Sequence, residues 1–190
     1  MSDILDLNKD APLLDLAKAA PTLRTLRARL TWSMHPVHGA SLTDGFDLDI
    51  FSFVLNTSEK ISGGQDVVFF NNKVYANGAI TLPQDNRTGG EETCAYKLAS
   101  IPADRSFVDI YVCVHEAQKR GQHFGMMAGA RLALEDAETD SLLQAYNIAE
   151  YAGKAVLHAG RLAKTAAGWT FQPIGEAAMA DPNSVARAYM

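Results

Sequence analysis

Two carboxylates stand two positions apart in the segment "GFDLDI", residues 45–50, which continues into the apolar stretch "FSFVL". Successive side chains of a β-strand point to opposite faces, so Asp47 and Asp49 share one face while Leu48 lies on the other. The two carboxylates are then roughly 7 Å apart along the strand, and they repel each other unless a positive group lies between them. The spacing indicates either a cation site or a solvent-facing strand that carries two hydrated aspartates.

A second group of oxygen-bearing side chains follows in "QDNRTGGEET", residues 84–93. Calcium takes 6 to 8 oxygen ligands, and a loop that contains glycine supplies carboxylate, amide, hydroxyl and backbone oxygens without steric cost. An EF-hand is excluded, because the loop lacks acidic residues at its third and fifth positions and has Tyr96 at its twelfth. The segment alone is also typical of a simple turn. Its candidate ligands are Asp85, Asn86, Thr88, Glu91 and Glu92.

A third group flanks the apolar run "VVFF" in "GGQDVVFFNN", residues 63–72. Asp66 comes before the run, and Asn72 ends the segment after it. Aspartate and asparagine are common turn residues, so the pattern indicates a hairpin with Asx turns. The alternative is a loop that supplies further oxygen ligands to the cation.

Histidines raise the question of other chemistry. His35 and His38 are three positions apart, but no cysteine or third histidine follows at a spacing typical of zinc sites. His115 ends an apolar segment and could act as the general base of a hydrolase in which Asp47 and Asp49 hold an activating ion. No GxSxG or HExxH motif supports that alternative, and the glycine-rich stretches lack the Lys-Ser or Lys-Thr ending of a phosphate-binding loop.

Nine segments rich in β-branched and aromatic residues must position these groups. They are bounded by Gly, Asn, Asp or Pro, and no long helical pattern alternates with them, which favours an all-β antiparallel sandwich or barrel over a parallel α/β sheet. Residues 5–12 and 14–21 each resemble a short strand closed by a turn, with a helix as the alternative for the second. Short helices are expected within 115–125 and 182–190. The nine segments are 25–32, 46–56, 66–72, 79–83, 107–117, 126–136, 141–148, 154–164 and 168–175.

Composition limits the function classes. A chain of 190 residues with a 47% hydrophobic fraction predicts one globular domain. The net charge of -5, with scattered basic residues, argues against nucleic acid or an anionic membrane as partner. We expect a cytoplasmic protein without membrane insertion, since no long apolar run or secretory leader is found. Cys94 and Cys113 lack a CxxC spacing and are expected to be reduced core residues.

Taken in order, these motifs resemble the TerD-domain family of tellurium-resistance and stress-response proteins. The resemblance rests on "LDLNKDAPLLDLAKAAPTL", "FDLDIFSFVL", "VVFFNN", "DNRTGG", "IYVCVHEAQKRGQHFG" and "GWTFQPIG". It implies a bacterial β-sandwich of two antiparallel sheets over residues 4–176, followed by a C-terminal tail, 177–190. It also implies calcium binding in acidic loops at one end and no enzymatic activity. The implied ligands are Asp47, Asp49, Asp85, Asn86 and Glu92, with Asp66, Asn72, Thr88 and Glu91 as further candidates.

Two departures from the family pattern modify this expectation. Gly45 stands where the family commonly has an aspartate, and the loop after Gly89 is shorter and less acidic than usual. Because calcium affinity follows the charge and number of ligands, we expect one site of reduced affinity rather than two tight sites. The predicted function is a calcium-binding, non-catalytic interaction module with a protein partner, for which a related family member is one candidate. A metal-free descendant that keeps only protein contacts is the alternative, and the hydrolase is a third.

Overall fold

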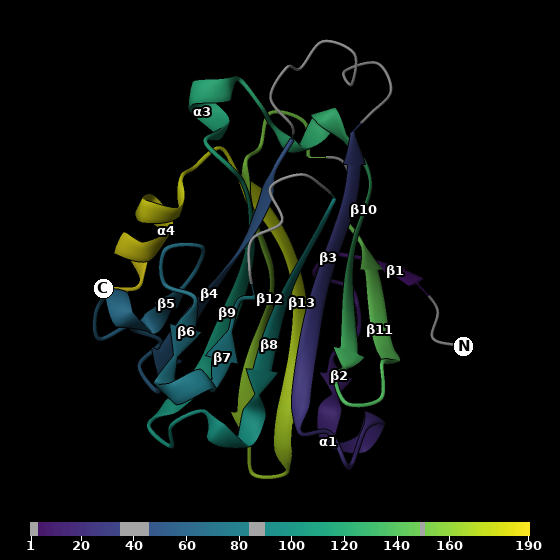
Figure 1. Cartoon of the computed structure of the whole chain (residues 1–190), viewed down its shortest axis with the longest axis vertical. Coiled ribbons are helices and arrows are strands. Elements are labelled where there is room, and N and C mark those ends of the chain that lie inside the picture. The colour runs from purple at the N-terminus through teal and green to yellow at the C-terminus, as the bar shows by residue number, and fades with distance from the viewer. Residues whose placement is uncertain (1–3, 35–45, 84–89, 149–150) are drawn as a thin grey trace.

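The computed structural model describes residues 4–34, 46–83, 90–148 and 151–190, and within these ranges two sheets pack face to face (Figure 1). One sheet has the strand order β1-β11-β10-β3-β8-β7-β6, and the other has the order β2-β13-β12-β9-β4-β5. The predicted β-sandwich is confirmed. The strands are β1 (Ile4–Asp6), β2 (Leu14–Asp15), β3 (Thr25–Met34), β4 (Leu48–Asn56), β5 (Val67–Val68), β6 (Val74–Tyr75), β7 (Ile80–Thr81), β8 (Glu91–Lys97), β9 (Arg105–Val114), β10 (Met127–Asp136), β11 (Ser141–Asn147), β12 (Val156–Thr165) and β13 (Gly168–Ala178).

All nine predicted segments contain strands, and the two early segments form the edge strands β1 and β2. β1 pairs with β11 in parallel, while the other strand pairs are antiparallel. The two-residue strand β6 and the longer strand β8 lie outside the predicted segments. β8 was missed because its first residues look like the end of an acidic loop. Its burial nevertheless alternates along the strand, with Glu92, Cys94 and Tyr96 facing inward.

The helical elements are short. α1 (Leu16–Ala19) follows β2 directly and is capped by the Asp15 carboxylate, which accepts from the Lys18 amide at 3.1 Å. The helix expected within 115–125 is divided into α3 (Ala117–Arg120) and the 3₁₀ turn η4 (Phe124–Met126). The remaining 3₁₀ turns are η1 (Gly64–Asp66), η2 (Ala76–Gly78) and η3 (Leu98–Ser100). Among the described residues no helix has the length and apolar character needed to cross a membrane.

β4 is buried on both faces, and this decides where the two aspartates lie. Leu48, Ile50 and Val54 belong to the main core between the sheets. Phe51 and Phe53 belong to a second apolar cluster on the outer face of the six-stranded sheet. The predicted period of two is therefore confirmed, but the face that carries Asp49 is covered rather than open to solvent.

The C-terminal segment forms part of that cover. β13 continues to Ala178, and α4 (Pro182–Ala188) begins with a capping box in which Asp181 and Ser184 cap each other. Val185, Ala186 and Tyr189 pack against the second cluster, and the Tyr189 carbonyl accepts from the Ile61 amide at 2.9 Å. The residues expected to form a tail are thus packed on the sheet beside β4 and β9.

Candidate metal centre

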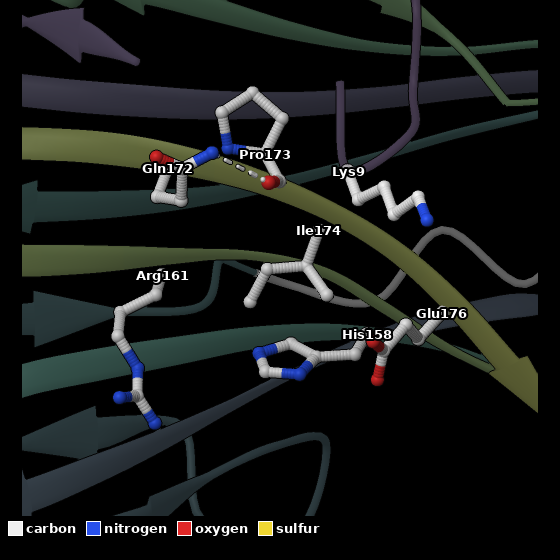
Figure 2. Close-up of a pocket in the computed structure, with 7 residues that line it drawn as sticks. All are labelled: Lys9, His158, Arg161, Gln172, Pro173, Ile174 and Glu176. Carbon is white, nitrogen blue, oxygen red and sulfur yellow. Dashed lines mark hydrogen bonds between the residues drawn. The ribbon is translucent and has the colours of Figure 1, made fainter. Parts of the chain in front are cut away.

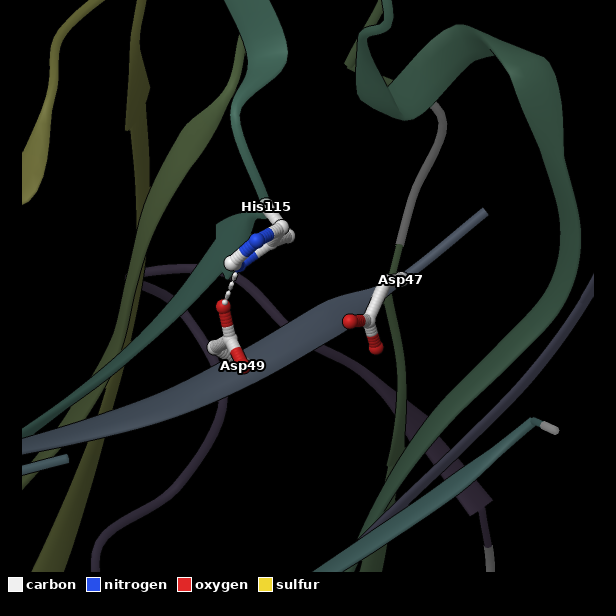
Figure 3. A group of neighbouring side chains, drawn as sticks. All are labelled: Asp47, Asp49 and His115. Atoms are coloured by element: carbon white, nitrogen blue, oxygen red, sulfur yellow. Dashed lines mark hydrogen bonds and ion pairs between the residues drawn. The ribbon is translucent and has the colours of Figure 1, made fainter. Parts of the chain in front are cut away.

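The register between β4 and β9 brings three candidate metal ligands to one place. Asp49 lies opposite Cys113, and the His115 amide donates to the Asp47 carbonyl at 3.0 Å, so His115 lies opposite Asp47. All three side chains leave the outer face of the six-stranded sheet, at the end of the sandwich that carries α3 (Figures 1 and 3). Asp47, Asp49 and His115 each offer a ligand atom, and these atoms lie within 4.8 Å of one another.

A direct contact joins His115 to Asp49. The Nδ1 atom of His115 is 2.9 Å from Oδ2 of Asp49, and the Asp49 side chain is only 4% exposed (Figure 3). The His115 side chain is 26% exposed, and its ring and the Phe70 ring form a T-shaped pair with 5.4 Å between the centroids. The imidazole is thus fixed by a carboxylate on one side and an aromatic ring on another. An ion that uses both of these atoms as ligands would have to replace the hydrogen bond between them.

Glu92, a predicted ligand, reaches the same strand from the opposite sheet. Its Oε2 atom accepts a hydrogen bond from the Ile50 amide. β5 pairs with β4 only at Ser52 and Phe53, so this amide lies beyond the paired part of the strand edge. A buried amide without an acceptor destabilises the folded state by about 1–3 kcal/mol. The Glu92 carboxylate prevents this loss by accepting from the Ile50 amide. Glu92 therefore has a structural role beside Asp49, and its ligation of a metal stays a prediction.

Asp66 and Asn72 lie near the other end of β4. The Asp66 carboxylate accepts from the Ser62 amide at 2.6 Å and pairs with Arg105 at 3.4 Å. Asn72 donates from Nδ2 to the Val67 carbonyl at 2.7 Å. Arg105 opposes Asn56, the last residue of β4, whereas Asp47 precedes its first residue. The structure does not bring Asp66 and Asn72 together with Asp47.

The acidic loop is described only at its end. Glu91 lies on the outer face of the other sheet and pairs with Arg29 at 3.4 Å. Asp85, Asn86 and Thr88 lie outside the described residues, as do His35 and His38. Their contribution to a cation site stays a prediction.

Both cysteines are buried and free, as expected. Burial raises the pKa of the Cys94 thiol to about 12, and it raises the pKa of Cys113 well above its usual range, with the charge of Asp49 adding to the effect. Because the thiolate is the reactive form, neither cysteine is prepared for direct chemistry with tellurite or another oxidant.

A polar network on the same sheet face was missed in the sequence. Asp109 is fully buried and binds Arg161 through two hydrogen bonds of 2.6 and 2.8 Å. The Tyr189 hydroxyl donates to the same carboxylate, and Tyr111 bonds Tyr189 at 2.8 Å. A lone aspartate inside the apolar run "FVDIYV" was the signal that could have identified it.

Two hollows adjoin this network. The first, of about 410 Å³, lies beside α4 between Tyr111, Glu176 and Tyr189. The second, of about 490 Å³, is bordered by Lys9, Arg161 and His158, and Figure 2 shows Ile174 between these side chains. The guanidinium of Arg161 already forms ion pairs with Asp109 and Glu59, so its positive charge is balanced by carboxylates of the same chain.

Comparison with known proteins agrees with this architecture. The TerD domain model matches residues 5–189. The tellurium resistance protein TerD of Serratia marcescens is 32% identical over 168 residues, which cover 85% of this chain and 84% of that protein. General stress protein 16U of Bacillus subtilis (strain 168) is 29% identical over 166 residues, covering 85% of this chain and 84% of that protein.

A solved structure extends the comparison to the fold. The crystal structure of a homologue of the telluride resistance protein TerD from Streptomyces coelicolor A3(2) superposes with a TM-score of 0.69 at 19% identity. The match covers 86% of this chain and 95% of that one, which shows a shared fold. The family match over nearly the whole chain, together with the identity to TerD of Serratia marcescens, shows that the chain belongs to the TerD domain family.

Proposed function

We propose that this protein is a non-catalytic, cation-binding interaction module that acts in the cytoplasm in bacterial defence against chemical stress. The observation that carries the proposal is the convergence of Asp47, Asp49 and His115 at one end of the sandwich. The relatives named for tellurium resistance and general stress support the biological setting. The net charge of -5 favours a cation over an anionic ligand.

Calcium is the ion that the family resemblance implies, and the group fits it in part. Asp47 and Asp49 provide carboxylate oxygens, the ligand type that calcium prefers. The further oxygens would come from the acidic loop, through Asp85, Asn86, Thr88 and Glu91, and from water. His115 supplies a nitrogen, which is not a calcium ligand.

The bound ion would act through charge and position. It would offset the repulsion between Asp47 and Asp49 and take the place of the contact between Asp49 and His115. Ligands from the loop would be held against the start of β4, so the ion would define a surface at this end of the sandwich. We propose that a partner protein, such as a related family member, binds to that surface.

Calcium should stabilise the folded chain through Asp49. At ten times the dissociation constant, bound calcium should raise the melting temperature by about 3–6 °C, because a ligand that binds only the folded state adds roughly 1.4 kcal/mol. Differential scanning calorimetry of the metal-stripped protein with increasing calcium measures this shift.

The variant Asp49→Asn should lose most of the calcium effect, while Asp104→Asn serves as the control at an exposed carboxylate. An unchanged melting temperature and no heat in a calcium titration would contradict calcium binding and favour the metal-free alternative.

One observation favours a second candidate function, metal-dependent hydrolysis. His115 lies within hydrogen-bonding distance of Asp49, as a base beside a metal-bound water would require. The contact through Nδ1 would leave Nε2 as the base, but no GxSxG or HExxH motif accompanies His115 in the sequence, so we place this candidate second. We expect no hydrolysis of p-nitrophenyl phosphate or p-nitrophenyl acetate above the blank with calcium or zinc. Turnover that His115→Gln abolishes would establish the hydrolase instead.

A further inference from the structure

We propose that His158 is a proton-operated release for the C-terminal helix α4. When the imidazole gains a proton, it takes the place of the Tyr189 hydroxyl on the Asp109 carboxylate, and α4 separates from the sheet. The release uncovers the second apolar cluster on the outer face of the six-stranded sheet. This inference concerns a different part of the molecule from the candidate metal centre, and it does not depend on the proposed function.

The first step is what holds α4 in place. No residue of the helix is fully buried, so its polar contacts matter. The Tyr189 hydroxyl donates to Asp109, the Tyr189 carbonyl accepts from the Ile61 amide, and the exposed Lys60 ammonium donates to the Ala188 carbonyl at 3.3 Å. The hydroxyl contact is the one made to a buried carboxylate, and such charge-assisted hydrogen bonds are the strong ones. The Tyr189 hydroxyl is therefore the main polar attachment of α4.

The second step is that the Asp109 carboxylate has no free acceptor position at Oδ2. Its Oδ1 atom accepts from Nε of Arg161 at 2.6 Å. Its Oδ2 atom accepts from Nη2 of Arg161 at 2.8 Å and from the Tyr189 hydroxyl. A carboxylate oxygen has two lone pairs, and both are used at Oδ2. A further donor at this oxygen must displace one of the two already present.

The third step is that His158 stands beside this oxygen without bonding it. Its Nε2 atom is 3.6 Å from Oδ2 of Asp109, which is longer than a hydrogen bond. Nε2 is buried and has no hydrogen-bond partner in the part of the chain that the structure describes. The ring is stacked on Tyr111, with 4.3 Å between the centroids, which fixes its orientation. Buried polar atoms are usually paired, so this nitrogen calls for an explanation.

The fourth step is the competition for Oδ2. Histidine changes its charge between about pH 5 and 8, and a charged donor binds a carboxylate more strongly than a neutral hydroxyl does. Arg161 keeps its position because it is charged and contacts both carboxylate oxygens, so the Tyr189 hydroxyl is the donor that leaves.

The sign of the pH effect follows from this competition. Charged His158 gains its acceptor only when Tyr189 has left Asp109, so protonation and the release of α4 favour each other. Docking of α4 is therefore complete above the pH range in which histidine titrates, and it weakens as the pH falls through that range.

The charges around His158 leave Asp109 as its acceptor. Glu176 lies opposite His158 on β13, but it is exposed, and an exposed ion pair contributes little. Figure 2 shows the neighbouring cations along the same hollow, and these cannot accept a proton-bearing donor. The titratable and charged groups that face His158 are Asp109 and Tyr111 on β9, Arg161 on β12 with its partner Glu59, Glu176 on β13, Tyr189 on α4 and Lys9 before β2.

The surroundings of α4 give it room to separate. The hollow of about 410 Å³ lies between the helix and the sheet and is lined by His158, Val185 and Tyr189. Met179, which joins β13 to α4, is 52% exposed. Protein interiors are otherwise closely packed, so this boundary is a place where the structure can open locally.

Hydrogen exchange of the full chain, followed by NMR at about pH 7.5 and about pH 5.5, tests the inference. The reporter is the Ile61 amide, which donates to the Tyr189 carbonyl, and the reference is the Lys97 amide, which donates to the Ala79 carbonyl in the other sheet. After correction for the intrinsic effect of pH on exchange, the protection of Ile61 should fall roughly three- to tenfold at the lower pH, because one linked proton changes an equilibrium by at most about tenfold per pH unit. The protection of Lys97 should stay the same.

Two variants should each remove the pH effect for a different reason. In His158→Gln the side chain stays polar but never gains a charge. In Tyr189→Phe the Oδ2 atom of Asp109 has a free lone pair, so charged His158 binds there without displacing a donor. The matched control is His123→Gln, the same substitution before η4 and outside this network, which should keep the wild-type response.

The possible results are distinct. A fall in Ile61 protection that both variants abolish and His123→Gln keeps supports the release. Protection in the wild type that is unchanged or higher at the lower pH overturns it, and so does an equal fall in His158→Gln.

Discussion

Asp109→Asn is expected to lower the free energy of unfolding at pH 7 by about 3 kcal/mol, because it removes the charge of one member of a buried ion pair. Asp109 is fully buried on β9, and its carboxylate receives hydrogen bonds from Arg161 and Tyr189. Removing one member of a buried ion pair leaves the other without its partner charge, which typically costs about 3–5 kcal/mol. The amide keeps the shape of the side chain and some hydrogen bonding, so the lower end of that range applies. Urea denaturation of both proteins measures the difference.

The same substitution should change the dependence of stability on pH. Burial of Asp109 favours its protonated form, but the hydrogen bonds from Arg161 and the contact with His158 outweigh this and lower the pKa to about 2. The folded-state pKa is depressed, so the stabilisation is complete above the unfolded pKa of about 3.8 and is lost as the pH falls through 2. The wild type should lose about 2 kcal/mol more than Asp109→Asn between pH 4 and pH 2.

An exposed carboxylate provides the control for that profile. Asp140 pairs with Arg27, but its side chain is 77% exposed, so Asp140→Asn should follow the wild-type profile closely. Identical acid unfolding of the wild type and Asp109→Asn would show that the pair of Asp109 and Arg161 contributes no pH-dependent stability.

The sequence predicted the strands well because their signals are local. Alternation of apolar and polar residues, with turn residues between the segments, predicts a strand without knowledge of its neighbours. The same alternation correctly placed Asp47 and Asp49 on one face of β4 and Leu48 on the other. It could not show that a second apolar cluster covers the face that carries Asp49. That cover comes from segments that are distant in the sequence, among them α4.

The candidate site was only partly predictable, because its completion depends on strand register. His115 lies 66 residues from Asp49 in the sequence, and a shift of one residue between β4 and β9 would place it on the other face. Glu92 and Asp66 carry the right atoms for a metal, but their partners lie on other strands: the Ile50 amide on β4 and Arg105 on β9. Residue type indicates which atoms can bind an ion, and only tertiary packing decides which of them are already bound.

Removal of residues 181–190 is expected to lower the free energy of unfolding by roughly 3 kcal/mol or more, because this segment covers the second apolar cluster. The truncation uncovers Phe53, whose ring centroid lies 5.2 Å from the ring centroid of Tyr189. It also removes the Tyr189 hydroxyl that donates to Asp109. Burial of one large side chain contributes about 1.5–3 kcal/mol, and a buried acceptor that loses its donor costs about 1–3 kcal/mol. Thermal melting measures the loss, and binding of the dye ANS should increase as the apolar face becomes exposed.

Tyr189→Phe separates the two contributions of this segment. The ring remains over Phe53, so ANS binding should stay at the wild-type level, while the lost hydroxyl should cost about 1–2 kcal/mol. A truncated chain with wild-type melting and no added ANS signal would mean that α4 does not stabilise the sheet. Lower stability and stronger ANS binding of the truncated chain would instead make α4 a structural part of the domain. The helix would then cover the outer face of β4 and β9, as the opposing sheet covers their inner face.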